Sequence, residues 1–155
     1  MAFRDVARDL VGEWSGRDEL WLGPGEPVRE SATEATVTTA AGGGFLLIAY
    51  TWSHGGEPHD GVLLARLTPG PGAVDMVWVD SFHTQGQFMT FAGQEADDGA
   101  MAAFTTWSPG SGPDWGWRIV LDSGGPDDLT MRMYIATPDG EEAPAVASRY
   151  ARRRD

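Results

Sequence analysis

A chain of 155 residues, 41% hydrophobic and 22% charged, has the size and composition of one globular domain spanning residues 1–155. The formal net charge is −12 and lysine is absent, which argues against nucleic acid or an anionic membrane as a partner. The lack of cysteine excludes disulfides and thiolate chemistry and fits a reducing compartment. The N-terminal stretch carries charges where a signal peptide needs an apolar run, and we therefore expect a cytoplasmic protein.

The first expected element is a short amphipathic helix at residues 3–10. Phe3, Val6, Ala7 and Leu10 recur there at helical spacing. Helical periodicity does not return after this point. The remainder of the chain consists of runs rich in β-branched and aromatic residues, which are typical of strands.

Short clusters of Gly, Pro, Asp and Ser separate these runs at regular intervals. The clusters are 23–27, 41–44, 54–61, 69–73, 81–86, 93–99, 108–113, 122–127 and 137–141. The gaps are too short for crossover helices, so neighbouring strands should pair antiparallel. The pattern predicts an all-β fold, a meander of about ten antiparallel strands. Closure into a barrel is the simplest way for such a meander to remove its edges.

The stretch Gly12-Glu13-Trp14 follows the expected helix directly. It resembles the G-x-W opening of calycin barrels, which include lipocalins, fatty-acid-binding proteins and nitrobindins. The resemblance implies that the helix plugs one end of the barrel. It also implies that Trp14 packs at that closed end against an arginine of the last strand, either Arg149 or Arg152.

A closer resemblance covers nearly the whole chain. The segments 50–64, 78–89, 114–121 and 129–134 are similar to an uncharacterised, largely bacterial family catalogued as domain of unknown function fifteen seventy-nine. This resemblance implies a calycin-like barrel and a general expectation of small-ligand binding. It implies no reaction and no catalytic residues.

Strand order alone predicts which residues share the open end of the barrel. Successive turns of a meander alternate between the two ends, so the odd-numbered turns should lie together, opposite the helix. All three histidines (His54, His59 and His83) fall in these turns, with Asp60 and Asp80 beside them. Neutral imidazoles at such a rim can ligate a metal, and the nitrobindin resemblance adds heme as a variant. Polar rim residues that face water are the favoured interpretation, and we expect no bound metal or cofactor.

The period-2 alternation of the strands predicts a lining of aromatic side chains and methionine, with polar groups near the mouth. The residues expected to contact a ligand there are Tyr50, Trp52, His54, Trp78, Asp80, His83, Met89 and Trp117. Such a lining suits a small apolar or aromatic molecule. The alternative is that these large side chains fill the barrel and leave no room for a ligand.

Asp80 has two possible roles. If it points inward beneath His83, burial would raise its pKa and make it a candidate general base. The favoured alternative is an aspartate that initiates the turn and accepts backbone N–H groups of residues 81–83.

Arg132 and Tyr134 lie on the same face of the strand before last, near the rim. In fatty-acid-binding proteins an R-x-Y pair on the final strand holds a ligand carboxylate, so the comparison is an analogy. Arginine can grip a carboxylate with two parallel hydrogen bonds. Because the strand has apolar residues on its other face, the pattern leaves open which face is inside, and a surface Arg–Tyr pair is the favoured interpretation.

These observations favour a small-molecule binding protein with no assigned catalytic residue. The first alternative is an enzyme that uses His83, Asp80 or His54 as acid or base in the same cavity, with or without a metal. The second alternative is a structural module with a filled interior and an exposed apolar surface that forms a homodimer.

Overall fold

The structure of the chain is a computed structural model that describes residues 2–68 and 72–154. The described residues form a short helix α1 (Phe3–Val6), a 3₁₀-helix (Ala7–Leu10) and ten strands. The strands are β1 (Gly12–Leu20), β2 (Arg29–Ala40), β3 (Phe45–His54), β4 (Glu57–Arg66), β5 (Ala73–Asp80), β6 (Met89–Glu95), β7 (Met101–Trp107), β8 (Trp115–Gly125), β9 (Asp128–Ala136) and β10 (Glu142–Arg152). None of the helices among these residues is long and apolar enough to cross a membrane.

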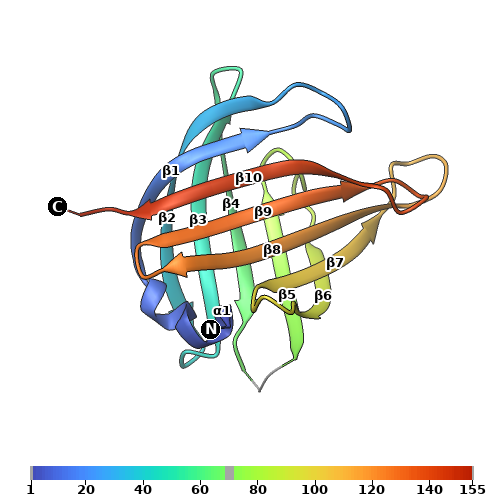
Figure 1. The fold of residues 1–155 in the computed structure, drawn as a ribbon. Coiled ribbons are helices and arrows are strands. Elements are labelled where there is room, and N and C mark those ends of the chain that lie inside the picture. The colour runs from blue at the N-terminus through green and yellow to red at the C-terminus, as the bar shows by residue number, and fades with distance from the viewer. Residues whose placement is uncertain (1, 69–71, 155) are drawn as a thin grey trace.

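Each strand pairs antiparallel with the next one along the chain (Figure 1). The first and last strands also pair, in a register that runs from Trp14 opposite Arg152 to Leu20 opposite Val146. This pairing closes the sheet into a barrel and satisfies both edges. The predicted all-β fold, with ten antiparallel strands and a short N-terminal helix, is therefore confirmed.

The turn expected at residues 54–61 is much shorter than predicted. Strand β3 continues to His54 and β4 begins at Glu57, so Gly55 and Gly56 alone form the turn. Both glycines have positive φ angles, 59° and 82°, as a two-residue hairpin turn requires. His59 therefore lies within strand β4, opposite Trp52. Of the turn expected at 69–73, residues 69–71 lie outside the described residues.

Burial alternates along the strands and divides the barrel interior into two halves. In β5, for example, Val74, Met76, Trp78 and Asp80 are buried while the residues between them are partly exposed. The half near the β3–β4 and β5–β6 turns holds the buried Asp18 and Asp80 carboxylates together with Trp52 and Trp78, whereas the half near the helix holds Phe3, Trp14 and the buried Arg4. Both halves therefore bury aromatic and polar side chains.

The N-terminal helix closes the other end by bonding to the turns around it (Figure 1). The buried guanidinium of Arg4 donates to the carbonyl of Leu67 (2.8 Å) and to the Glu95 carboxylate (3.0 Å). The Phe3 amide donates to the carbonyl of Gly99 (2.8 Å). These bonds connect the helix to the β4–β5 and β6–β7 connections, so the helix occupies the closed end as predicted.

Trp14 packs at this closed end in the way that the calycin resemblance implied. Its indole N–H donates to the carbonyl of Leu10 (2.8 Å), and the side chain is completely buried. The guanidinium of Arg152 lies over the indole ring, 4.6 Å from its centroid. Of the two candidate arginines, Arg152 is the partner, while Arg149 pairs with Glu19.

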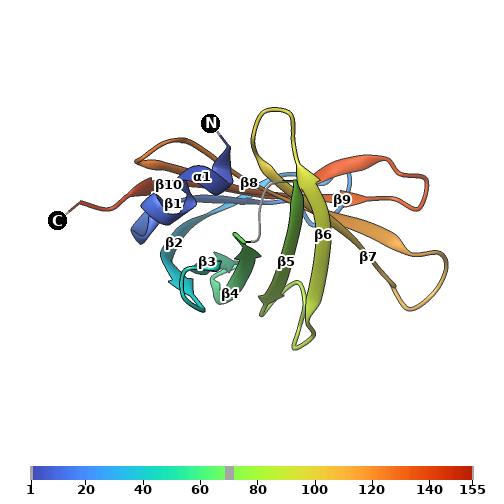
Figure 2. The same cartoon turned by 90° about the horizontal axis from the view of Figure 1, so that it is seen from below.

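Strands β6 and β7 separate towards the open end of the barrel. They pair from Ala92–Glu95 to Met101–Phe104, and Figure 2 shows the two ribbons diverging beyond this ladder. Residues 89–91 and 105–107 therefore continue past the paired region. The open half has a less tightly closed wall here than the half next to the helix.

Candidate ligand-binding site

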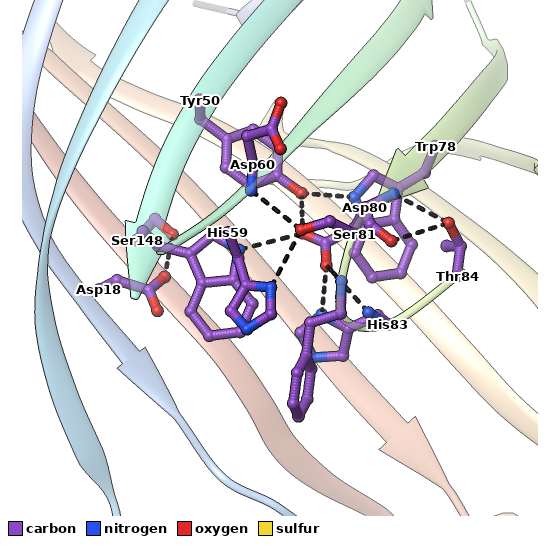
Figure 3. Close-up of polar contacts among 12 residues, drawn as sticks. Asp18, Tyr50, His59, Asp60, Trp78, Asp80, Ser81, His83, Thr84 and Ser148 are labelled. Carbon is purple, nitrogen blue, oxygen red and sulfur yellow. Dashed lines mark hydrogen bonds and ion pairs between the residues drawn. The ribbon is translucent and has the colours of Figure 1, made fainter. Parts of the chain in front are cut away.

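Asp80, the last residue of β5, is the centre of a buried hydrogen-bond network at the open end (Figure 3). Its carboxylate oxygen Oδ2 accepts from the Tyr50 hydroxyl (2.6 Å) and from the Trp52 indole N–H (3.2 Å). The other oxygen, Oδ1, accepts from the backbone N–H groups of Phe82 (2.8 Å) and His83 (2.9 Å). Asp80 thus joins strand β3 to the β5–β6 connection.

The expected turn role of Asp80 is therefore present, and it is combined with an inward position. Burial alone would raise the pKa of the carboxyl group. Hydrogen bonds from His83 and Tyr50, together with the nearby His83 imidazole, outweigh burial and lower the pKa to about 2. The expectation of a raised pKa is wrong, and a carboxylate this acidic and this well bonded is a poor general base.

The network continues from Asp80 to the neighbouring strands. The Tyr50 hydroxyl accepts from the Trp78 indole N–H (2.7 Å) while it donates to Asp80. Gly61 makes room for this ring, since a Cβ atom there would lie 2.3 Å from the Tyr50 hydroxyl oxygen. These contacts fix the orientation of both aromatic side chains.

The β5–β6 connection is bonded to the barrel at its start and exposed at its tip. The Asp80 amide donates to the Thr84 hydroxyl (2.8 Å), and the Ser81 hydroxyl accepts from the Asp60 amide (3.1 Å). Residues 85–88 are all exposed, and the Phe88 side chain is 81% exposed. Gln85 has a positive φ of 49°, a conformation uncommon outside glycine.

The His83 side chain lies among the aromatic rings at the mouth of the barrel. Its ring centroid lies 5.6 Å from Trp52, 5.3 Å from Trp78 and 5.4 Å from Trp117. Its Nδ1 atom lies 3.2 Å from the Oδ1 atom of Asp80. His83 thus covers the top of the interior and is held there by stacking and by Asp80.

All three histidine rings lie next to the ring of Phe82. Centroid distances from Phe82 are 5.6 Å to His54, 5.2 Å to His59 and 5.0 Å to His83. Strand order alone had predicted that the three histidines share a rim. Within residues 2–68 and 72–154, no group of three or more His, Asp or Glu side chains is arranged to hold a metal ion.

Asp18 is a second buried carboxylate in the same half of the barrel, and the sequence analysis missed it. It is 4% exposed, and among the described residues it accepts a hydrogen bond from the Ser148 hydroxyl alone (2.7 Å). Burial raises its pKa to about 6, opposed by the Ser148 bond and reinforced by the negative charge of Asp80. The alternation Trp14, Gly16, Asp18, Leu20 along β1 was the signal that would have placed Asp18 inside.

A small cavity lies between Asp18 and the Asp80 network. The side chains that surround it are Asp18, Tyr50, Trp52, Trp78, Asp80, His83, Met131, Met133 and Val146. Its volume of about 10 Å³ is enough for about one water molecule. In this conformation, then, the large side chains of the open half nearly fill the barrel.

Three more of the residues predicted for the site lie at different positions in the open half. Trp117 stacks on Trp78 at a centroid distance of 5.5 Å, in the wall next to the cavity. Met89 packs against the core and pairs with Trp78 across the β5–β6 ladder. His54 lies at the rim, in contact with Phe82.

Arg132 and Tyr134 lie on the outer face of the barrel. The residues that alternate with them, Met131 and Met133, are the ones that line the cavity. The Tyr134 ring is covered from outside by the Arg118 guanidinium, 4.4 Å from its centroid. This arrangement agrees with the surface Arg–Tyr pair favoured from the sequence, and it corrects the alternative in which Arg132 and Tyr134 contact a ligand, because adjacent residues of a strand point to opposite faces.

Comparisons with solved structures agree with this fold. The crystal structure of Rv2717c from M. tuberculosis is 17% identical, covers 97% of this chain and 96% of its own, and superposes with a TM-score of 0.65. An S-type phycobiliprotein lyase, CPES from Guillardia theta, is 14% identical, covers 100% and 94%, and has a TM-score of 0.62. At such low identity these likenesses concern the fold alone.

None of the curated proteins matches the chain. A family described as "Protein of unknown function (DUF1579)" matches residues 4–152, nearly the whole length. The resemblance suggested by the sequence segments is confirmed, and the chain belongs to this family.

Proposed function

We propose that the chain binds a small, mostly apolar or aromatic molecule in the open half of the barrel. The composition of the cavity supports this proposal most directly, because it combines Trp and Met side chains with two buried carboxylates. Ligand sites commonly join an apolar wall to a few fixed polar groups. Ionisable residues with shifted pKa values in such a site strengthen the assignment.

The polar groups of the open half are costly if their only purpose is stability. A buried carboxylate requires partners, and well-packed apolar residues of similar size are often at least as stable. Trp117 is buried, yet among the described residues nothing accepts a hydrogen bond from its indole N–H. Because unpaired buried donors destabilise a fold, a role in binding explains these groups better than packing does.

A ligand larger than water requires the side chains above the cavity to move. His83 is the natural candidate, because it covers the cavity from a connection whose residues 85–88 are exposed. The separation of β6 from β7 leaves the wall beside this connection without a continuous ladder. The open form that we propose has the His83 ring withdrawn from between Trp52 and Trp117.

The small cavity volume also favours a second candidate, a filled barrel that acts through its surface. That interpretation needs no movement of His83 and predicts no binding in the interior. The two candidates therefore differ in the response of the cavity to a ligand.

Isothermal titration calorimetry with indole separates the two. We expect the wild-type protein to bind indole weakly and the His83→Ala variant to bind it about tenfold more tightly, because an apolar cavity of suitable size accepts an aromatic guest. His59→Ala is the matched control, since it removes a rim imidazole from outside the cavity and should leave the affinity unchanged. Absence of binding in both wild type and His83→Ala would contradict the proposed function and favour the filled barrel.

A further inference from the structure

We propose that the molecule bound in this cavity is an organic cation, an aromatic or alkyl ammonium, and that the Asp18 carboxylate is its counter-ion. This inference rests on the proposed function and adds the chemical class of the ligand to it.

The two carboxylates differ in how well their charges are compensated. Asp80 accepts from the Tyr50 hydroxyl, the Trp52 indole and two backbone amides, and the His83 Nδ1 atom also lies within hydrogen-bond distance. Asp18 accepts from Ser148 alone among the described residues, although it is just as deeply buried. A buried charge with one neutral partner is unfavourable, and a bound cation would supply what is missing.

No cationic side chain of the described residues lines the cavity except His83, when it is protonated. The charged and titratable groups that flank Asp18 or share the cavity with it are Arg17 and Glu19 on β1, Glu30 on β2, Tyr50 on β3, Asp80 on β5, His83 on the β5–β6 connection, and Arg149 and Tyr150 on β10. Both arginines are bonded to carboxylates on the outer surface, Arg17 to Glu30 and Arg149 to Glu19. The cavity is therefore lined by negative charge from Asp18 and Asp80.

The aromatic part of the lining suits the same class of ligand. Trp52, Tyr50 and Trp78 present rings to the cavity, and the faces of such rings attract ammonium groups. Met131 and Met133 add polarizable surface that adapts to different shapes. The net charge of −12 also favours the approach of a cation over that of an anion.

An anionic ligand would meet the opposite conditions. Arg132, the arginine that could hold a carboxylate if it faced inward, lies on the outer face. A carboxylate in the cavity would instead face Asp18 and Asp80, and like charges at such close quarters repel.

The test uses three indoles of similar shape that differ in charge: tryptamine, 3-ethylindole and indole-3-propionate. Affinities are measured by calorimetry at about pH 8, where Asp18 is ionised. We expect tryptamine to bind about tenfold more tightly than 3-ethylindole, and indole-3-propionate to bind most weakly.

Asp18→Asn keeps the shape of the side chain and its contact with Ser148, and it should remove the preference for tryptamine. Glu19→Gln is the matched control. It removes a carboxylate from the adjacent residue, whose side chain pairs with Arg149 outside the cavity, and it should leave the preference intact. The indole N–H spectrum of each variant checks that the fold is retained.

The outcomes separate the two proposals. Equal binding of tryptamine and 3-ethylindole, or a preference that survives Asp18→Asn, would overturn the cation assignment and leave the proposed function standing. No binding of any of the three compounds, in wild type or in His83→Ala, would overturn both. A preference for tryptamine that disappears in Asp18→Asn and also weakens as the pH falls through about 6 supports both.

Discussion

The closed and open halves of the barrel both bury polar side chains, but they compensate them differently. At the closed end, Arg4 and Trp14 donate to backbone carbonyls and to Glu95, and Arg152 covers the Trp14 ring. At the open end, Asp80 accepts hydrogen bonds from side chains as well as from the backbone amides of its turn. Asp18 accepts a hydrogen bond from Ser148 alone among the described residues. The closed half therefore serves to stabilise the fold, whereas the open half contains the Asp18 carboxylate, whose charge no described cationic side chain neutralises.

This contrast separates the groups that stabilise the fold from the groups that are available to a ligand. Groups whose hydrogen bonds are complete within the chain stabilise the folded state. Groups whose hydrogen bonds are incomplete can gain binding free energy from a ligand. Variants in the two halves should therefore differ in their effects on stability and on binding.

Trp14→Ala should cause the largest loss of stability, about 3 to 5 kcal/mol, because it leaves a cavity at the closed end. Urea denaturation followed by circular dichroism measures the change. Trp115→Ala, at a partly exposed indole on β8, is the control and should cost no more than about 1 kcal/mol. Similar losses for both variants would contradict the scaffold role of the closed end.

Asp80→Ala should cost about 3 kcal/mol, since four donors lose their acceptor in the interior. The pKa of Asp80 is lowered to about 2 from its usual 3.8, so the unfolded chain binds more protons between these values. Stability from this group is therefore present above about pH 4 and lost as the pH falls towards 2. Asp80→Ala should remove that acid-side loss, and a variant that keeps it would contradict the assignment.

Gly61→Ala should cost about 2 kcal/mol, because the added Cβ would meet the Tyr50 hydroxyl at 2.3 Å and the Val79 carbonyl at 2.7 Å. The clash should also weaken the bond from Tyr50 to Asp80 and change the chemical shift of the Trp78 indole N–H. Gly125→Ala is the control, since nothing lies within 4 Å of a Cβ there. An unchanged Trp78 signal in Gly61→Ala would refute the coupling.

Asp18→Asn should have the smallest effect and the opposite sign, a gain of about 1 to 2 kcal/mol at about pH 8. Its pKa is raised to about 6 from 3.8, so the folded state binds more protons between these values. Stability therefore falls as the pH rises from about 4 to about 6. Asp18→Asn should flatten this part of the profile, whereas Glu19→Gln should not.

The sequence predicted the barrel and its closed end well because those depend on local pattern. Strand periodicity and turn residues specify a meander, and Gly12 and Trp14 mark the start of the first strand. The packing of Trp14 against Arg152 followed from the family resemblance. The common rim of the three histidines followed from strand order, even though Gly55 and Gly56 made the turn shorter than expected.

The chemistry of the open half was harder to predict because it depends on partners from distant strands. Whether the pKa of Asp80 is raised or lowered overall depends on its contacts with Tyr50 and His83, and the spacing of residues in the sequence does not reveal those contacts. Asp18 is one of three acidic residues in β1. The alternation along the strand places it inside, but its partner Ser148 on β10 is not evident from the local sequence. The sequence left the inner face of β9 open because both of its faces carry apolar residues, so Arg132 and Tyr134 could be placed on the surface only as the favoured alternative.

The most direct test of the division between the two halves is the heteronuclear NMR spectrum of the seven tryptophan indole N–H groups, recorded with and without indole. We expect shifts at Trp52 and Trp78, whose N–H groups belong to the Asp80 network. We expect no shift at Trp14, whose N–H is bonded to Leu10 at the closed end. Shifts confined to the exposed indoles, or a Trp14 shift as large as those of Trp52 and Trp78, would contradict a binding site in the open half.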